Sequence, residues 1–519
     1  MPHSCFFAMS AVGGIWQSLT NQPQIGISTM VLLTDGTVLC RGDDDTAAGG
    51  RQWLRLTPTA AGTYVDGVWS PAAPSSNSRR FYASAVLADG TVLVAGGEES
   101  DGGADLNAAE LYDPKTDTWK TLPTPSGWTA IGDAPCCVLA DGRVLLGSIV
   151  TTSTAVYDPL HNSWSPAGNK DDRSDEETWT LLPDGTVLTV ECDNHPKAEK
   201  FVPSQNRWVS AGTVPVDLVQ ASSSEIGPAV LMADGRVFAL GATGHTALYS
   251  RPPTPDLVGT WLAGPDLPRD ANGVQLITKD APAALLPNGH VLFATSPLAE
   301  GSVPKGYPGP SHFFEFDGHA FTALAAPGTS GSPAYAFRLL LLPNGQVLAA
   351  NGTSDLEIYT PDGSPDPAWA PRIVDCPKVI SAGATYRLQG TQLNGLSQAV
   401  SYGDDATMAT NYPLVRLVRT NPTRTWYCRT HGHTTMGVAT GSAIVATTFD
   451  VPEGIEDGAA QLEVVSNGIP SEPVTITLDS APVVTNGSGR PPKTGCLARS
   501  SVAVSLVGLV LVVLARLIT

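Results

Sequence analysis

The sequence is poor in charged residues, which make up 15% of its 519 positions, whereas about a quarter is usual for soluble proteins. With 42% hydrophobic residues as well, the chain is neither a disordered segment nor a coiled coil, because both are rich in charged side chains. Long stretches without glycine or proline are rare, since the chain holds 52 glycines and 43 prolines. Both residues interrupt helices, so the composition predicts an all-β protein.

Clusters of basic residues are also missing. Lysine and arginine number 30 against 49 aspartates and glutamates, which leaves a net charge of −19. Such a polyanion repels the phosphate backbone, so we expect no nucleic-acid partner. The eight cysteines contain no Cys-x-x-Cys pair, which argues against a zinc ribbon or a thioredoxin-like motif. They are too sparse for a disulfide scaffold, although one or two disulfide bridges remain possible.

The two ends of the chain indicate different compartments. The N-terminus lacks the basic segment and long apolar run of a signal peptide. At the C-terminus, residues 502–515 are apolar except for Ser505 and lie between two arginines. We expect residues 500–519 to form a hydrophobic helix that attaches the chain to a membrane, behind a flexible spacer at 480–499.

Three kinds of attachment suit this tail. It fits a single transmembrane anchor, a cleaved GPI signal, or a signal that resembles a sortase motif at Pro-Pro-Lys-Thr-Gly. In each case we expect the protein on a membrane or cell wall, facing outward rather than toward the cytoplasm.

Internal repetition dominates the rest of the chain. A hydrophobic strand, an Asx-Gly turn and a second strand recur seven times, about every fifty residues. The turns lie at Asp35-Gly36, Asp89-Gly90, Asp141-Gly142, Asp184-Gly185, Asp234-Gly235, Asn288-Gly289 and Asn344-Gly345. These dipeptides favour two-residue hairpins in which both central residues have positive φ.

Several repeats end with an aromatic residue, a turn and a tryptophan, the pattern of kelch repeats. The tryptophans that follow these turns are Trp119, Trp164, Trp208 and Trp261. Four short strands per repeat cannot bury both faces alone, but seven repeats around an axis can. We therefore predict a seven-bladed kelch propeller at 12–370, closed by the segment around Trp16.

After the propeller the period stops. Residues 371–479 hold alternating strands separated by turns, which predicts an immunoglobulin-like β-sandwich. A kelch propeller followed by such a domain resembles the galactose oxidase and glyoxal oxidase family. That resemblance implies a copper-radical oxidase, which oxidises an alcohol or aldehyde with O₂ and releases hydrogen peroxide. Its site holds two tyrosines, two histidines and a cysteine that is thioether-linked to one tyrosine.

The resemblance places these roles on particular residues. The tyrosines correspond to Tyr82 and Tyr335, and one histidine corresponds to His431. Where the family has the cysteine and the other histidine, this chain has Ile27 and Ala336. Isoleucine cannot form the thioether and alanine cannot bind copper, which argues against copper-radical oxidation in its usual form.

A second possible metal site lies in the C-terminal region. Cys428, His431 and His433 are spaced as Cys-x-x-His-x-His and carry the ligand types of a copper or zinc site. Without a visible distant partner, a structural loop with surface histidines is the simpler interpretation.

Polar residues also follow the fourth and fifth buried strands. Glu191, Asp193, His195 and His245 would line one polar pocket if these loops surround a central cavity. Ordinary turn chemistry is the alternative that we favour.

Together these features predict a monomeric, membrane-tethered module that binds a carbohydrate or a protein. The first alternative is an oxidase of alcohols or aldehydes that uses copper or another metal. The second is an intracellular kelch scaffold at a membrane. We assign no cofactor, with copper reserved for the oxidase alternative.

Overall fold

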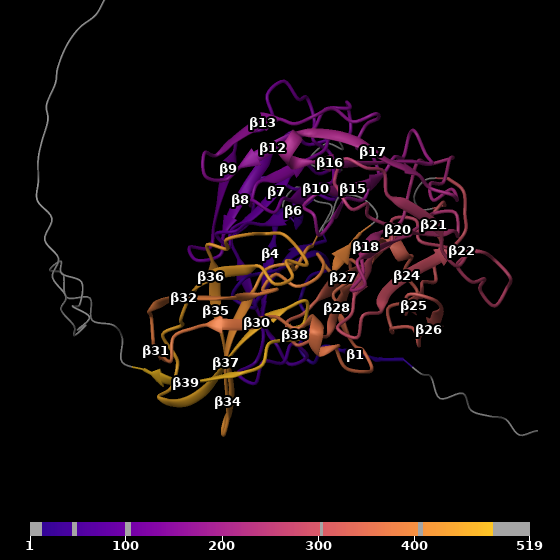
Figure 1. Cartoon of the computed structure of the whole chain (residues 1–519). Coiled ribbons are helices and arrows are strands. Elements are labelled where there is room, and N and C mark those ends of the chain that lie inside the picture. The colour runs from indigo at the N-terminus through magenta and orange to yellow at the C-terminus, as the bar shows by residue number, and fades with distance from the viewer. Residues whose placement is uncertain (1–12, 44–48, 99–104, 302–304, 403–407, 481–519) are drawn as a thin grey trace, which may run out of the picture. The chain divides into compact units, whose positions relative to one another are not determined.

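The computed structural model describes residues 13–43, 49–98, 105–301, 305–402 and 408–480 (Figure 1). The only helices in these residues are short 3-10 turns, namely η1 (Gly49–Arg51), η2 (Pro203–Gln205), η3 (Ala334–Ala336) and η4 (Pro367–Trp369). The prediction of an all-β protein is therefore confirmed. One compact unit comprises Met1–Pro482 and a second comprises Val483–Thr519, and the second lies outside the described residues.

Seven antiparallel sheets form the blades of a propeller, and in blades 1 to 6 the four main strands follow chain order from the inside outward. Blades 1 to 4 consist of β2 (Ile27–Leu32), β3 (Val38–Gly42), β4 (Trp53–Thr57), β5 (Val68–Ala72); β6 (Ala83–Val86), β7 (Val92–Ala95), β8 (Ala109–Asp113), β9 (Thr118–Leu122); β10 (Cys136–Val138), β11 (Val144–Leu146), β12 (Ala155–Asp158), β13 (Ser163–Pro166); and β14 (Thr180–Leu181), β15 (Val187–Val190), β16 (Lys197–Val202), β17 (Arg207–Thr213). Blades 5 to 7 consist of β18 (Ala229–Leu231), β19 (Arg236–Leu240), β20 (Thr246–Ser250), β21 (Thr260–Ala263); β23 (Ala283–Leu285), β24 (Val291–Pro297), β25 (His312–Phe316), β26 (Phe321–Ala323), with β22 (Leu276–Ile277) paired to β24; and β27 (Arg338–Leu341), β28 (Val347–Ala350), β29 (Glu357–Thr360). The predicted seven-bladed propeller is confirmed.

The Asx-Gly turns join the two inner strands of each blade, as predicted, but their geometry differs from the predicted one. In the first turn Gly36 has a φ of 77°, whereas Asp35 has no positive φ. The Asp35 carboxylate accepts a hydrogen bond of 3.0 Å from the Thr37 N–H, and the Gly36 N–H donates to the Leu33 carbonyl at 3.0 Å. This side-chain hydrogen bond stabilises a negative φ at Asp35. The turn is therefore a type I turn followed by a glycine in the left-handed conformation.

The first described strand closes the ring. β1 (Ile15–Ser18) pairs antiparallel with β29 of blade 7, with Trp16 opposite Tyr359. The Trp16 ring lies 5.1 Å from Phe313 and 4.9 Å from Tyr359 between ring centroids. The outer strand of the last blade therefore comes from the start of the chain, as the sequence predicted.

The remaining strands follow the propeller. They are β30 (Arg372–Asp375), β31 (Val379–Ser381), β32 (Thr385–Thr391), β33 (Val400–Ser401), β34 (Leu414–Thr420), β35 (Thr423–His431), β36 (Ile444–Asp450), β37 (Gly458–Ser466), β38 (Ile469–Pro470) and β39 (Val474–Asp479). All except β33 pair with one another around a separate hydrophobic cluster. Backbone N–H groups of Thr430, His433 and Met436 donate to the carbonyls directly before the Asx-Gly turns of blades 1, 2 and 3, so these strands cover the turn face of the propeller.

β33 departs from the predicted division at residue 371. It pairs antiparallel with β23, the inner strand of blade 6, with Ser401 opposite Ala283. Inner strands line the central channel of a propeller, so the chain around β33 runs inside that channel. The C-terminal region therefore supplies a strand to the propeller as well as its own sheet.

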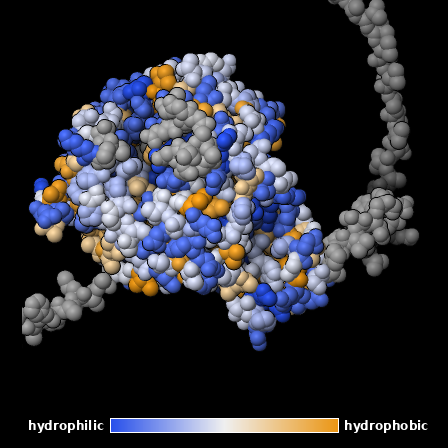
Figure 2. All heavy atoms as spheres, turned by 180° about the vertical axis from the view of Figure 1, so that it is seen from behind, coloured by the Kyte–Doolittle hydropathy of each residue, from blue (hydrophilic) through white to orange (hydrophobic). Residues whose placement is uncertain are grey.

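The surface shows no broad hydrophobic area on the face drawn in Figure 2, where hydrophobic residues are scattered among polar ones. No helix among the described residues has both the length and the apolarity to cross a membrane. The predicted helix at 500–519 lies outside the described residues, as does the spacer at 480–499 after Ser480.

Candidate functional site

A cavity of about 120 Å³ lies at the end of the channel where the inner strands begin, opposite the turn face. Blades 1, 2 and 7 line it with Ser28, Thr29, Arg41, Asp43, Arg80, Phe81, Tyr335, Ala336, Arg338, Asn351 and Gly352. The cavity thus gathers the segments to which the family resemblance pointed. None of these lining residues carries an imidazole or a thiol.

The side chains singled out by the resemblance lie at different depths. Ile27 and Tyr82 are fully buried in the core, and their chain neighbours Ser28 and Phe81 line the cavity instead. Tyr335 lines the cavity, half-buried, with its ring centroid 4.7 Å from that of Tyr307.

The segment in the channel was missed by sequence reasoning. The Ser401 hydroxyl lies 3.1 Å from the Thr178 hydroxyl of blade 4 and accepts a 3.3 Å bond from the Ala229 N–H of blade 5. The buried Tyr402 donates its hydroxyl proton to the Tyr335 carbonyl at 2.7 Å. No local sequence pattern predicts that this segment enters the channel, because its bonding partners lie far away in the sequence.

Arginines concentrate on one side of the channel mouth. The Arg338 guanidinium lies 3.5 Å from the centroid of the Tyr402 ring, a cation–π geometry. Asp43 Oδ1 lies 3.1 Å from Arg80 Nη2 and 3.6 Å from Arg41 Nη1. This side of the mouth is therefore cationic, with one carboxylate bridging two of its guanidinium groups.

Carboxylates gather in the loops before the inner strands of blades 4, 5 and 6. Oxygen atoms of Glu176, Glu225 and Asp280 lie within 4.8 Å of one another. The Tyr307 hydroxyl lies 2.5 Å from Glu225 Oε1 and 2.6 Å from Asp280 Oδ2. Burial, and then repulsion from Glu225, raises the pKa of both Glu176 and Asp280 well above the ordinary carboxyl range. Glu176 and Asp280 therefore bind protons more readily than exposed carboxyl groups do.

This cluster had a signal in the sequence that we did not use. Glu176, Asp280 and Phe81 each lie eight residues before the Asx residue of the turn in their own blade. Those Asx residues are Asp184, Asn288 and Asp89. Glu176, Asp280 and Phe81 all have positive φ, at 61°, 46° and 43° respectively. Non-glycine residues adopt this conformation at a cost, and such residues are common at functional sites.

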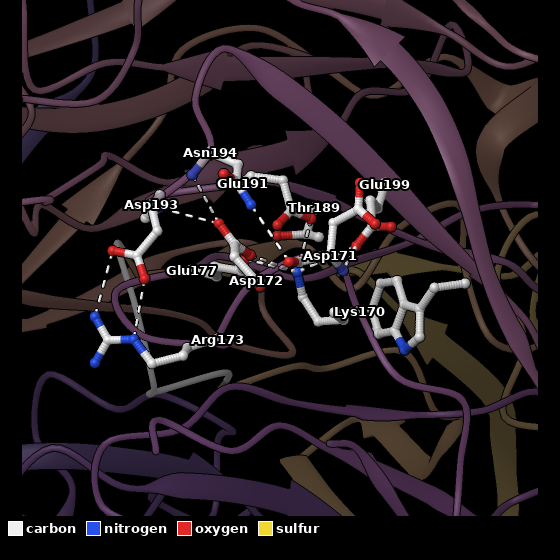
Figure 3. A network of polar contacts seen from close by, with 12 residues as sticks. Lys170, Asp171, Asp172, Arg173, Glu177, Thr189, Glu191, Asp193, Asn194 and Glu199 are labelled. Atoms are coloured by element: carbon white, nitrogen blue, oxygen red, sulfur yellow. Dashed lines mark hydrogen bonds and ion pairs between the residues drawn. The ribbon is translucent and has the colours of Figure 1, made fainter. Parts of the chain in front are cut away.

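Glu191 belongs to a different, fully buried network (Figure 3). Lys170 Nζ lies 2.7 Å from Glu191, 2.8 Å from Glu177, 3.3 Å from Asp172 and 3.5 Å from Glu199. Burial opposes the charge on Lys170, but Glu177 and Asp172 raise its pKa, whereas burial raises the pKa of Glu177 to about 8. The lysine supplies the positive charge that a metal ion would supply among these carboxylates.

The other residues of the predicted polar pocket point to separate partners. Asp193 accepts bonds from the Arg173 guanidinium at 3.0 and 3.3 Å (Figure 3). His195 Nδ1 lies 2.8 Å from an oxygen of Asp217, and His245 Nδ1 lies 2.8 Å from an oxygen of Asp266. Glu191, Asp193, His195 and His245 thus each bond a different partner among the described residues.

The Cys-x-x-His-x-His residues also face different surroundings. Cys428 lies in the core of the C-terminal strands, and burial raises its pKa well above that of an ordinary thiol. His431 Nε2 lies 3.1 Å from Asp450. His433 bonds Thr447 at 2.9 Å, and burial lowers its pKa to about 3. Within the described ranges these three side chains form no cluster of metal ligands. The segment that carries both histidines bonds the turn face, away from the cavity.

Comparison with known proteins agrees with this architecture. A family model of the kelch motif matches residues 79–126, which span blade 2. An F-box/kelch-repeat protein of Arabidopsis thaliana is 33% identical over 103 residues, which cover 18% of this chain and 24% of the plant protein. A kelch-like protein of Aspergillus terreus is 31% identical over 138 residues, which cover 26% of this chain and 29% of the fungal protein. The chain thus spans less than a third of either relative.

The solved structures that are similar over most of the chain include that of an enzyme. It is a fungal alcohol oxidase of the AA5 family in complex with copper, and the two chains superpose with a TM-score of 0.52 at 15% identity. The similarity covers 90% of this chain and 99% of the oxidase. At this identity the likeness concerns the fold alone, and it shows a kelch propeller with structural similarity to galactose-oxidase-like enzymes.

Proposed function

We propose that this protein is a ligand-binding module built on the scaffold of a galactose-oxidase-like enzyme, without copper-radical chemistry. One observation carries the proposal. The cavity that gathers the family's site segments from blades 1, 2 and 7 has neither an imidazole nor a thiol among the described residues that line it. Residues 396–402 and 408–412, the described residues on either side of the gap after β33, contain no histidine.

The residues present do not fit a radical copper site. Copper(II) favours imidazole ligands, but Ala336 occupies the position of one histidine, and His431 is bonded to Asp450 on the turn face. The buried Ile27 takes the place of the cysteine. The guanidinium groups of Arg41 and Arg338 in the same lining also repel a divalent cation.

A binding role suits what remains. Kelch propellers serve as platforms for other proteins, and a protein or a carbohydrate is the ligand that we propose. The C-terminal strands would form an immunoglobulin-like domain that covers the turn face and leaves the opposite face open to ligand. Residues 500–519 would tether the module to a membrane, facing outward.

The test is a measurement of copper and peroxide on the purified full chain. We expect no tyrosyl-radical absorption after Cu(II) loading and no peroxide from galactose, glyoxal or methylglyoxal. The single variants Ile27→Cys and Ala336→His should stay inactive, because the radical cofactor needs both the ligand and the thioether. Their combination is the matched gain-of-ligand control and should bind more copper than the unaltered chain. Radical absorption and peroxide release by the unaltered protein would overturn the proposal.

A further inference from the structure

A recess of about 320 Å³ lies between blades 2 and 3, away from the channel mouth. Three segments form it: the loop after β9 at residues 125–130, residues 148–155 from the end of β11 to the start of β12, and the end of blade 3 at 164–169. Its volume lies at the small end of the range of ligand pockets, roughly 300–1,000 Å³. The recess is thus large enough for a small molecule and too small for a folded partner.

The lining of this recess carries no charge. The chain has 49 acidic and 30 basic side chains, yet none of the described residues that line this recess carries a charge. A charged ligand would lose hydration here without meeting an opposite charge, which is unfavourable. The occupant that suits these walls is therefore neutral.

Two tryptophans are held in place as walls. The Trp164 indole N–H donates to the Pro123 carbonyl at 2.7 Å, and its ring lies 5.1 Å from the Tyr157 ring. The backbone carbonyl of Trp128 accepts a 2.7 Å hydrogen bond from the Asn107 side chain, and the partly buried Trp128 side chain packs against the hydrophobic core. Because these contacts exist without a ligand, binding does not have to order the aromatic surfaces.

Hydroxyl and amide groups surround the tryptophans. Ser148 and Thr151 bond each other and the loop backbone, which shapes the recess. By contrast, the exposed side chains of Ser126, Ser165 and Asn169 make no hydrogen bond with other residues in the described part of the chain. These groups both donate and accept hydrogen bonds, so they remain available to a ligand.

We propose that this recess binds a neutral carbohydrate of one or two sugar rings. A sugar presents an apolar C–H face to an indole ring and hydroxyl groups to serine and asparagine at the same time. A purely aliphatic ligand would leave the hydroxyl and amide groups without partners. This inference rests on the proposed binding function and names one of its ligand classes.

The test uses the full chain and a panel of neutral mono- and disaccharides that includes galactose, N-acetylglucosamine, lactose, maltose and cellobiose. Saturation-transfer NMR identifies a ligand, and calorimetry measures its Kd. We expect Trp164→Ala and Trp128→Ala to weaken binding by about tenfold or more, as for a central aromatic contact. Asn169→Ala, at an exposed position, should weaken it without affecting folding.

Trp119 provides a matched control. It occupies the same place in blade 2, with its indole N–H bonded to the Ala73 carbonyl at 2.8 Å and its ring 5.0 Å from Tyr112. It does not line the recess, so Trp119→Ala should lower stability as Trp164→Ala does and leave the Kd unchanged. Equal loss of binding in both variants, with Asn169→Ala unaffected, would overturn the inference.

Two further results would contradict it. One is the absence of binding across the panel, and the other is a preference for sialylated or sulfated sugars over neutral ones. Peroxide is measured on the same preparations. Peroxide release would count against the proposed function whatever the sugar result, so the two failures are distinguishable.

Discussion

Buried ionisable side chains are the most unusual residues of this protein. Lys170, Glu177 and Glu191 are buried, and the Lys170 ammonium group bonds both carboxylates. Removing charges from water is costly unless each one is paired, and here one ammonium group serves several carboxylates. Protonation of Glu177 relieves part of the excess negative charge, which agrees with its pKa of about 8.

The replacement Glu177→Gln tests this arrangement through pH. A carboxyl whose pKa is raised in the folded state binds more protons there than in the unfolded chain, so stability falls as pH rises toward the folded pKa of about 8. Glutamine does not titrate, so in the variant the free energy of unfolding should fall less steeply with rising pH. The difference in slope should reach up to about 1.4 kcal/mol per pH unit. Urea titrations at several pH values measure it.

The control for this experiment is Glu472→Gln, because Glu472 is exposed. It should reproduce the pH dependence of the unaltered chain. A slope that is the same for Glu177→Gln and the unaltered chain would show that Glu177 is ionised in the folded protein.

Among the elements, two short strands have effects beyond their length. β1 completes blade 7, and β33 enters the channel and pairs with blade 6. Both pairings join segments that are distant in the chain, and such contacts hold the ring closed. An open propeller would expose unpaired strand edges on both sides of the gap.

Removal of residues 1–20 should therefore destabilise the whole ring. The deletion removes β1 and the Trp16 ring, which packs against Phe313 and Tyr359. Loss of a packed tryptophan alone costs about 3–5 kcal/mol, so we expect a lower midpoint in urea and in thermal melting. A chain that starts at Gly13 keeps β1 and is the matched control. Equal midpoints for the two deletions would contradict the role of β1 in closure.

For the whole molecule, the blades and the C-terminal strands belong to one compact unit that ends at Pro482. The hydrophobic residues 502–515 lie beyond it in the sequence. If residues 500–519 are the tether, as proposed, the compact unit should fold without them and only the attachment to a membrane should be lost.

Deletion of residues 499–519 tests that separation. We expect the truncated chain to melt at the temperature of the full chain and to remain in the supernatant after membranes are sedimented. A full-length chain with charged residues in place of 502–515 is the control for length. Sedimentation of the truncated chain with membranes would refute the anchor, and its unfolding would refute the independence of the compact unit.

The sequence by itself determined the propeller. Seven Asx-Gly turns, spaced about fifty residues apart, predict seven blades because turn chemistry and strand alternation act over a few neighbouring residues. The partner of Trp16 was also predictable, since a ring must close on its last blade. Even so, the turn type was wrong in detail, because the Asp35 side chain bonds the backbone of Thr37 and stabilises a different turn.

Tertiary structure alone decided which polar residues meet. Ser401 reaches Ala283 and Tyr402 reaches Tyr335 through the channel, and nothing local in the sequence encodes such distant pairings. Lys170 meets carboxylates from several strands and loops of its own blade, and the fold of that blade, rather than a sequence pattern, brings them together. Local patterns specify strands and turns, whereas a site depends on how blades pack around an axis, and that packing is set by the chain as a whole.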